Sequence, residues 1–192
     1  IPKTDCVEKN IIDIYTKKIK KFYDVISFMK DNYINSEIVN SYDSLSECKC
    51  FLMKKGSQLI TSKDIPDNGV DLIITDPPYL EQVLYSEYMQ LYKPFLNLDY
   101  NLSDEIIVSS APSRNKDKDE YFNLLDQVFL MCSKKLKTNH YMCLYFHDCN
   151  LEVWNKLIRI LEKNCFRFIT QIHINKTATL KNIISPKKSL NG

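Results

Sequence analysis

The feature that most constrains this chain is a short apolar run, Val70–Thr75, followed directly by the tetrapeptide Asp-Pro-Pro-Tyr at residues 76–79. The run is rich in β-branched residues and lies between turn-forming residues 66–69 and two prolines. This pattern is typical of a buried strand in a parallel sheet. Ligands of open parallel sheets bind outside the carboxyl ends of the strands. A polar side chain at position 76 is therefore predicted to project into a ligand-binding crevice.

Apolar side chains along the rest of the chain recur with the spacings of alternating strands and helices. Helices are predicted at residues 9–33, 82–96, 117–137 and 151–161, with Pro94 kinking or ending the second of them. Strands are predicted at residues 50–53, 70–75, 141–147 and 166–174. Alternation of this kind predicts an α/β fold with helices on both faces of the sheet. We expect a helical lead-in segment at residues 1–48 and the α/β domain at residues 49–192.

Composition narrows the class of protein. The net charge of +2 means that any nucleic-acid contact must come from a local basic surface. The seven cysteines are odd in number and show no C-x-x-C spacing. No zinc site or other metal site is therefore expected, and a reducing, cytoplasmic environment fits best. No apolar run approaches the roughly 20 residues of a membrane helix, so no membrane is expected among the partners.

The tetrapeptide suits a reaction at an amine. The exocyclic nitrogen of adenine is a poor nucleophile because its lone pair is delocalised into the ring. Two acceptors held close to this nitrogen, the Asp76 carboxylate and the Pro77 carbonyl, would draw it toward a tetrahedral geometry. Pro77 and Pro78 restrict the backbone, so both acceptors would be fixed in advance. Tyr79 would offer a flat face for an extruded base. The alternative is that the tetrapeptide has a purely structural role as a rigid turn after a strand.

The segment 70–79, VDLIITDPPY, resembles motif IV of amino-methyltransferases that use S-adenosylmethionine. Residues 55–57 and 65–68 are similar to the loop that leads into this motif. Residues 81–88, EQVLYSEY, resemble a V-x-Y-S-E segment in a subgroup of bacterial adenine-specific DNA methylases. The resemblance covers about residues 50–190, and it is carried mainly by the first of these motifs.

The resemblance implies a Rossmann-like methyltransferase sheet and methyl transfer to the N6 amine of adenine in DNA, for example in restriction-modification. The catalytic residues would be Asp76, Pro77, Pro78 and Tyr79. The residues that contact S-adenosylmethionine would include Asp76, Gly56 and Ser57. The residues that contact DNA would include Tyr79, Tyr85 and Ser86, although Tyr85, Ser86 and Glu87 are equally compatible with helix packing.

Two further candidates come from the residues themselves. Arg114 and Lys116 lie in a polar loop and could grip phosphates, although a solvated surface is the more usual role for such residues. His147 ends the predicted strand 141–147, so it would border the same crevice as Asp76.

The chain departs from the family in its glycines. The family's F-x-G-x-G turn lets the backbone approach the cofactor, whereas the three glycines here, at 56, 69 and 192, form no such pattern. The chain could be a fragment of a larger enzyme, one piece of a split or permuted enzyme, or a degenerate relative that binds without catalysis. We favour the fragment, and we expect the fold to be incomplete and the chain alone to be inactive. The expected partners are DNA and the remaining part of the enzyme or a second subunit.

The target amine is open to alternatives. It could be the N4 amine of cytosine, a guanine in ribosomal RNA or a glutamine side chain. Protein-glutamine enzymes more often have Asn at the first motif position, so Asp76 argues mildly against that target. From a different class, the chain could be a non-catalytic module that binds nucleic acid.

Overall fold

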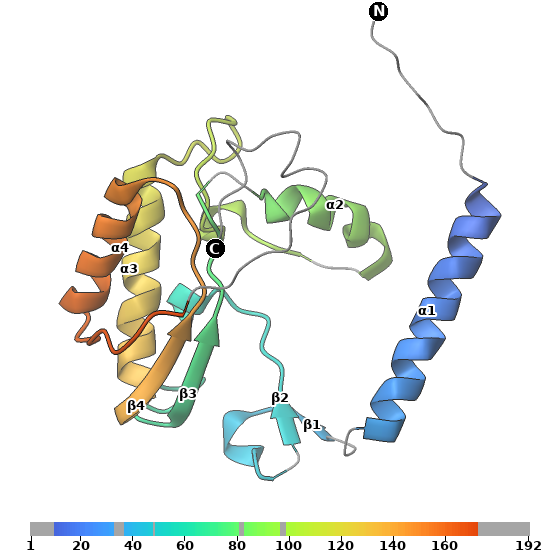
Figure 1. The fold of residues 1–192 in the computed structure, drawn as a ribbon, viewed down its shortest axis with the longest axis horizontal. Coiled ribbons are helices and arrows are strands. Elements are labelled where there is room, and N and C mark those ends of the chain that lie inside the picture. Colours follow the sequence, from blue (N-terminus) through green and yellow to red (C-terminus); the bar gives the residue numbers. More distant parts are fainter. Residues whose placement is uncertain (1–9, 33–36, 48, 81–82, 97–98, 173–192) are drawn as a thin grey trace, which may run out of the picture. The chain divides into compact units, whose positions relative to one another are not determined.

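The computed structural model describes residues 10–32, 37–47, 49–80, 83–96 and 99–172 (Figure 1). The chain divides into two compact units, residues 1–53 and residues 54–192, and each is described by itself. The sequence pattern places the boundary slightly earlier, between residues 48 and 49.

The first unit contains one long helix and a small pair of strands. Helix α1, Ile11–Asn32, lies within the predicted range 9–33 and follows Asn10, whose side-chain oxygen accepts a hydrogen bond from the backbone N–H of Ile12. Strand β1, Glu37–Val39, pairs in parallel with β2, Lys49–Phe51. Of the helices that the structure describes, none has the length and apolar character needed to cross a bilayer.

The second unit is built on two parallel strands (Figure 1). Strand β3, Val70–Thr75, has the predicted bounds. Strand β4, Leu136–Leu144, begins earlier and ends earlier than the predicted strand 141–147. Leu136 is already paired with Val70, and the register is irregular before Leu72 pairs with Tyr141. His147 therefore lies in the loop that follows the strand, not within it.

Two helices pack side by side against one face of this strand pair (Figure 1). Helix α3, Lys118–Lys135, follows Asp117, and helix α4, Leu151–Lys163, follows Asn150. Both side chains accept a hydrogen bond from a backbone N–H of the first turn, as N-cap residues do. The core between the helices and β4 consists of Tyr121, Phe122, Leu125, Phe129, Val153 and Leu157, with Met142 and Leu144 against it. Both helices agree with the predictions.

The prediction of helices on both faces of the sheet is not met in the described part of the chain. The outward-facing Leu72, Ile74 and Tyr141 are 52%, 66% and 64% exposed. The predicted strand 166–174 is also absent, because residues 166–172 have no ladder partner, and residues 173–174 lie outside the described residues. An alternating apolar pattern becomes a strand only where another strand pairs with it. The described residues combine helices with one small parallel sheet in each unit, which is consistent with an incomplete α/β fold.

Helix α2, Tyr85–Leu96, follows the motif. It begins a little later than predicted and ends just beyond Pro94. Pro94 lies in the last turn of the helix, where the expected kink or end has little effect on the helix before it.

Candidate functional site

The motif lies at the carboxyl end of the strand pair. Asp76 directly follows β3, and the loop after β4 begins at Tyr145, whose backbone N–H donates to the carbonyl of Thr75 at 2.9 Å. Because the strands are parallel, both loops leave the sheet at the same edge. The Tyr79 ring makes edge contacts there with Phe146 and His147, at centroid distances of 5.5 and 6.5 Å. His147 thus borders the motif, as the sequence predicts, although it does so from a loop.

The backbone of the motif loop is anchored to the rest of the unit at two points. The buried hydroxyl of Tyr121, on α3, donates to the carbonyl of Pro78 at 2.6 Å. The N–H of Val108 donates to the carbonyl of Leu80 at 3.1 Å. Leu80 has a φ of 45°, a left-handed conformation that is unfavourable for a bulky side chain. Such strain persists only where the surroundings impose it, so the shape of this loop is fixed by its contacts.

The two functional side chains of the motif contact each other. The Tyr79 hydroxyl donates a hydrogen bond to the Asp76 carboxylate. Burial of the phenol and the nearby carboxylate raise the pKa of Tyr79 well above its usual value. Tyr79 is therefore a neutral donor at physiological pH, and Asp76 is an exposed acceptor that already holds one donor.

The three acceptors of the motif thus differ in the donor that each of them binds. The Pro78 carbonyl is bound by a buried group, Tyr121, and the Asp76 carboxylate is bound by a more accessible one, Tyr79. Among the described residues, no donor reaches the Pro77 carbonyl. Asp76 is exposed and Pro77 is buried. A carboxylate oxygen and a neighbouring carbonyl oxygen can together accept both hydrogens of an NH₂ group that enters such a site.

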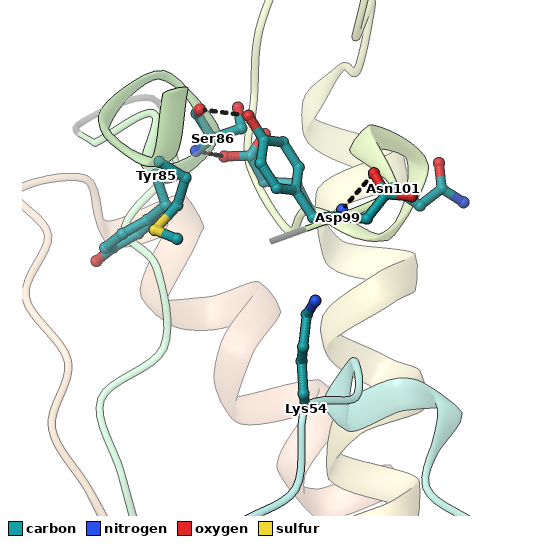
Figure 2. Close-up of a pocket in the computed structure, with 8 residues that line it drawn as sticks. Lys54, Tyr85, Ser86, Asp99 and Asn101 are labelled. Carbon is teal, nitrogen blue, oxygen red and sulfur yellow. Dashed lines mark hydrogen bonds between the residues drawn. The ribbon is translucent and has the colours of Figure 1, made fainter. Parts of the chain in front are cut away.

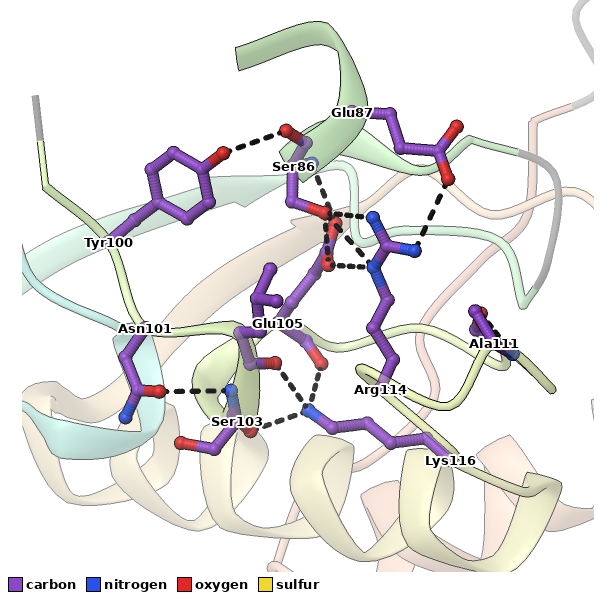
Figure 3. Close-up of polar contacts among 11 residues, drawn as sticks. Ser86, Glu87, Tyr100, Asn101, Ser103, Glu105, Ala111, Arg114 and Lys116 are labelled. Atoms are coloured by element: carbon purple, nitrogen blue, oxygen red, sulfur yellow. Dashed lines mark hydrogen bonds and ion pairs between the residues drawn. The ribbon is translucent and has the colours of Figure 1, made fainter. Parts of the chain in front are cut away.

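Ser86 and Arg114, both predicted to contact DNA, belong to a network of hydrogen bonds and ion pairs (Figure 3). The N–H and the hydroxyl of Ser86 donate to the Glu105 carboxylate at 2.8 and 2.7 Å. The Arg114 guanidinium lies 3.3 Å from the same carboxylate and 3.2 Å from that of Glu87, and its side chain is only 5% exposed. The network ties the amino end of α2 to the loop that follows it. Arg114 is a structural residue in this arrangement.

Lys116 is likewise held by hydrogen bonds within the protein (Figure 3). The residue is 4% exposed, and its ammonium donates to the carbonyls of Leu102, Ser103 and Glu105. Burial lowers its pKa. A phosphate contact would require the ammonium to leave all three carbonyls. The predicted phosphate contacts of Arg114 and Lys116 therefore do not agree with this geometry.

The remaining predicted residues lie elsewhere in the second unit. Gly56 and Ser57 lie at the start of a short 3-10 helix, and no hydrogen bond among the described residues joins them to Asp76. Tyr85 lines a hollow of about 240 Å³ between α2 and the loop at residues 99–105 (Figure 2). The lining of this hollow includes Met89 and Tyr100 but no residue of the motif.

The described residues do not fit a complete pocket for S-adenosylmethionine. A Cβ on Gly56 would meet the side chain of Gln58 at 3.0 Å, so the space beside this glycine is filled by a neighbour in the chain. The sequence also has no glycine-rich turn. No group of three or more His, Cys, Asp or Glu side chains in the described part of the chain could hold a metal ion. Comparison with protein-family models, with characterised proteins and with solved structures gave no match for this chain.

Two residues of the site were not found from the sequence. Tyr121 lies on the apolar face of a predicted helix, where a tyrosine is indistinguishable from any other core residue. Glu105 precedes an apolar stretch without a recognisable motif. In the sequence, the pair between Arg114 and Glu105 is indicated only by the charge of Arg114, because a buried arginine needs a negatively charged partner.

Proposed function

We propose that this chain supplies the amine-binding part of a DNA methyltransferase that modifies the N6 amine of adenine and uses S-adenosylmethionine. The observation that carries the proposal is the pair of acceptors at the carboxyl end of β3, the Asp76 carboxylate and the Pro77 carbonyl. The Asp76 carboxylate holds a donor from Tyr79 in the same way that it would hold an amine. The sequence around the motif, VDLIITDPPY, supports this assignment by its resemblance to the family.

On this proposal the residues of the motif act on the base. Asp76 and the Pro77 carbonyl accept the two hydrogens of the amine, which draws the nitrogen toward a tetrahedral geometry and directs its lone pair away from the ring. Tyr79 releases Asp76 and stacks on the extruded base. The acceptors need no rearrangement during the reaction, because the prolines and the contacts of the loop hold them in place.

The methyl donor would be bound largely by polypeptide outside the described residues, either another segment of the enzyme or a second subunit. The lack of a glycine-rich turn in the sequence and the lack of a fitted pocket beside Gly56 support this division.

The proposal can be tested without the methyl donor. The chain should bind a fluorescent single-stranded oligonucleotide that contains one adenine more tightly than the same strand with purine, which lacks the exocyclic amine. Asp76→Ala should remove this preference. Asp71→Ala is the matched control, because Asp71 is an exposed carboxylate at the opposite end of β3. Equal affinity of the wild-type chain for both strands would contradict the proposed function.

A further inference from the structure

We propose that Tyr121 is a positioning residue for this site: its hydroxyl holds the Pro78 carbonyl and thereby fixes the direction of the adjacent Pro77 carbonyl, the second acceptor of the proposed amine site. This inference rests on the function proposed above. It adds to the motif a residue of α3 that lies 43 positions away from Pro78 in the sequence.

The first step is that the hydrogen bond of Tyr121 cannot be exchanged for water. The residue is 0% exposed and lies within the core cluster, with its ring edge-on to Phe122. Burying a hydroxyl without a partner costs more than the bond itself contributes. The Pro78 carbonyl, at 2.6 Å, is the partner that satisfies it.

The second step is that α3 is a rigid support for this hydroxyl. The helix is capped at its amino end by Asp117, whose side chain accepts from the N–H of Glu120 and whose carbonyl accepts from the N–H of Tyr121 at 3.1 Å. Leu125 and Phe129, further along the helix, are also buried. The position of the Tyr121 hydroxyl is therefore set by the packing of the helix and not by the motif loop.

The third step concerns the direction of the two proline carbonyls. A residue that precedes proline adopts an extended conformation, in which consecutive carbonyls point in different directions. When Tyr121 directs the Pro78 carbonyl toward α3, the Pro77 carbonyl must point elsewhere. Among the described residues it receives no donor, unlike the carbonyls of Pro78 and Leu80. Tyr121 thus fixes the direction of the Pro77 carbonyl through its hold on the adjacent Pro78 carbonyl.

The alternative is that Tyr121 only fills the core. The two roles differ in their effect on the recognition of the amine. Loss of a core contact lowers the stability of the fold but does not change the ratio of affinities for adenine and purine. Loss of a positioning contact lowers that ratio, because the second acceptor is no longer held in place.

The test compares Tyr121→Phe with Tyr100→Phe in the full 192-residue chain. Tyr100 is the matched control because its hydroxyl also donates to a backbone carbonyl, that of Ser86 at 3.0 Å, away from the motif. Residues 78 and 79 form the only Pro-Tyr step in the sequence. A protein with ¹³C in its proline carbonyls and ¹⁵N in its tyrosines therefore gives a single carbonyl–amide NMR correlation, which reports on Pro78.

We expect Tyr121→Phe to shift this signal upfield and to lower the preference for the adenine strand over the purine strand about three- to tenfold, the usual worth of one hydrogen bond. Tyr100→Phe should change neither. A second variant with 3-fluorotyrosine at position 121 keeps the ring and strengthens the donor, so it should fold, keep the preference and shift the signal downfield.

Three outcomes separate the possibilities. If the wild-type chain prefers adenine and Tyr121→Phe keeps the same preference, Tyr121 is a core residue and the inference is wrong. If the Pro78 signal does not respond to either change at position 121, the hydrogen bond is absent and the inference is also wrong. If the wild-type chain itself shows no preference for adenine, the proposed function fails and the positioning role fails with it, whatever the NMR result.

Discussion

The hydroxyl of Tyr79 donates a hydrogen bond to the carboxylate of Asp76, three residues earlier in the same loop. The protein's own donor therefore occupies the acceptor that the proposed reaction needs. A base that enters the site must break this bond before its amine can reach Asp76, and the same movement makes the Tyr79 ring available for stacking.

Removal of the Tyr79 hydroxyl alone should therefore tighten binding. We expect Tyr79→Phe to lower the dissociation constant for the adenine strand severalfold, because the base no longer competes with the phenol for Asp76. Tyr79→Ala should have the opposite effect, since it removes a stacking contact worth about 1–3 kcal/mol. Fluorescence anisotropy with the two oligonucleotides measures both changes. If Tyr79→Phe weakens binding as much as Tyr79→Ala does, the hydroxyl contributes to binding and does not oppose it.

Alkaline pH should destabilise the fold through Tyr121. Burial raises the pKa of Tyr121 to about 12, whereas a tyrosine in an unfolded chain ionises near about 10. Below about pH 10 both states keep the proton, and this contribution to stability is complete. Above that pH the unfolded state binds fewer protons than the folded state, so the free energy of unfolding falls as the pH rises toward 12.

Urea denaturation at pH 8, 9, 10 and 11 measures this effect, and Tyr121→Phe is the comparison. The variant should be less stable at pH 8 but should lose less stability than the wild-type chain between roughly pH 10 and 11. Parallel losses in the two proteins would show that Tyr121 is not protected from ionisation by the fold.

The parts of the fold that were predicted from the sequence are those specified by local signals. Strand β3 has a continuous apolar run between turn residues, and α3 and α4 have apolar faces that begin after Asp117 and Asn150. The start of β4 was missed because its irregular pairing with β3 depends on a strand more than sixty residues earlier. In the described part of the second unit, helices cover only one face of the strand pair. This was missed for the same kind of reason, since alternation along the chain does not say which helix covers which face.

The candidate site, too, was predicted only where the sequence contains a local signal. The sequence placed Asp76 and Tyr79 directly after a strand, because a rare tetrapeptide next to an apolar run is a local signal, and their role in the reaction stays a prediction. It placed Arg114 and Lys116 on a basic surface, because charged residues in a loop are usually solvated. Their burial depends on partners such as Glu105 that no periodicity reveals.

Arg114 should matter for stability more than for binding. Arg114→Ala would leave the Glu105 carboxylate, whose side chain is 12% exposed, without its cationic partner. Breaking a buried pair from one side costs about 3–5 kcal/mol, although the hydrogen bonds that Ser86 donates to Glu105 should keep the loss near the lower end. Lys156→Ala is the control: its pair with Asp119 is exposed on both sides, and its loss should cost at most about 1 kcal/mol. Urea denaturation measures both, and similar losses would contradict the buried role of Arg114.

The methyl donor should not be held by this chain alone. Because the described residues form no fitted pocket and the sequence has no glycine-rich turn, the 192-residue chain should bind S-adenosylmethionine weakly or not at all. Isothermal titration calorimetry tests this directly, with the adenine oligonucleotide as a positive control for a folded, binding-competent protein. Tight binding at one molecule per chain would mean that these residues hold the donor by themselves. In that case the division of the site between this chain and other polypeptide would have to be abandoned, whereas the amine-binding role of Asp76 would stand unchanged, because it depends only on the preference for adenine over purine.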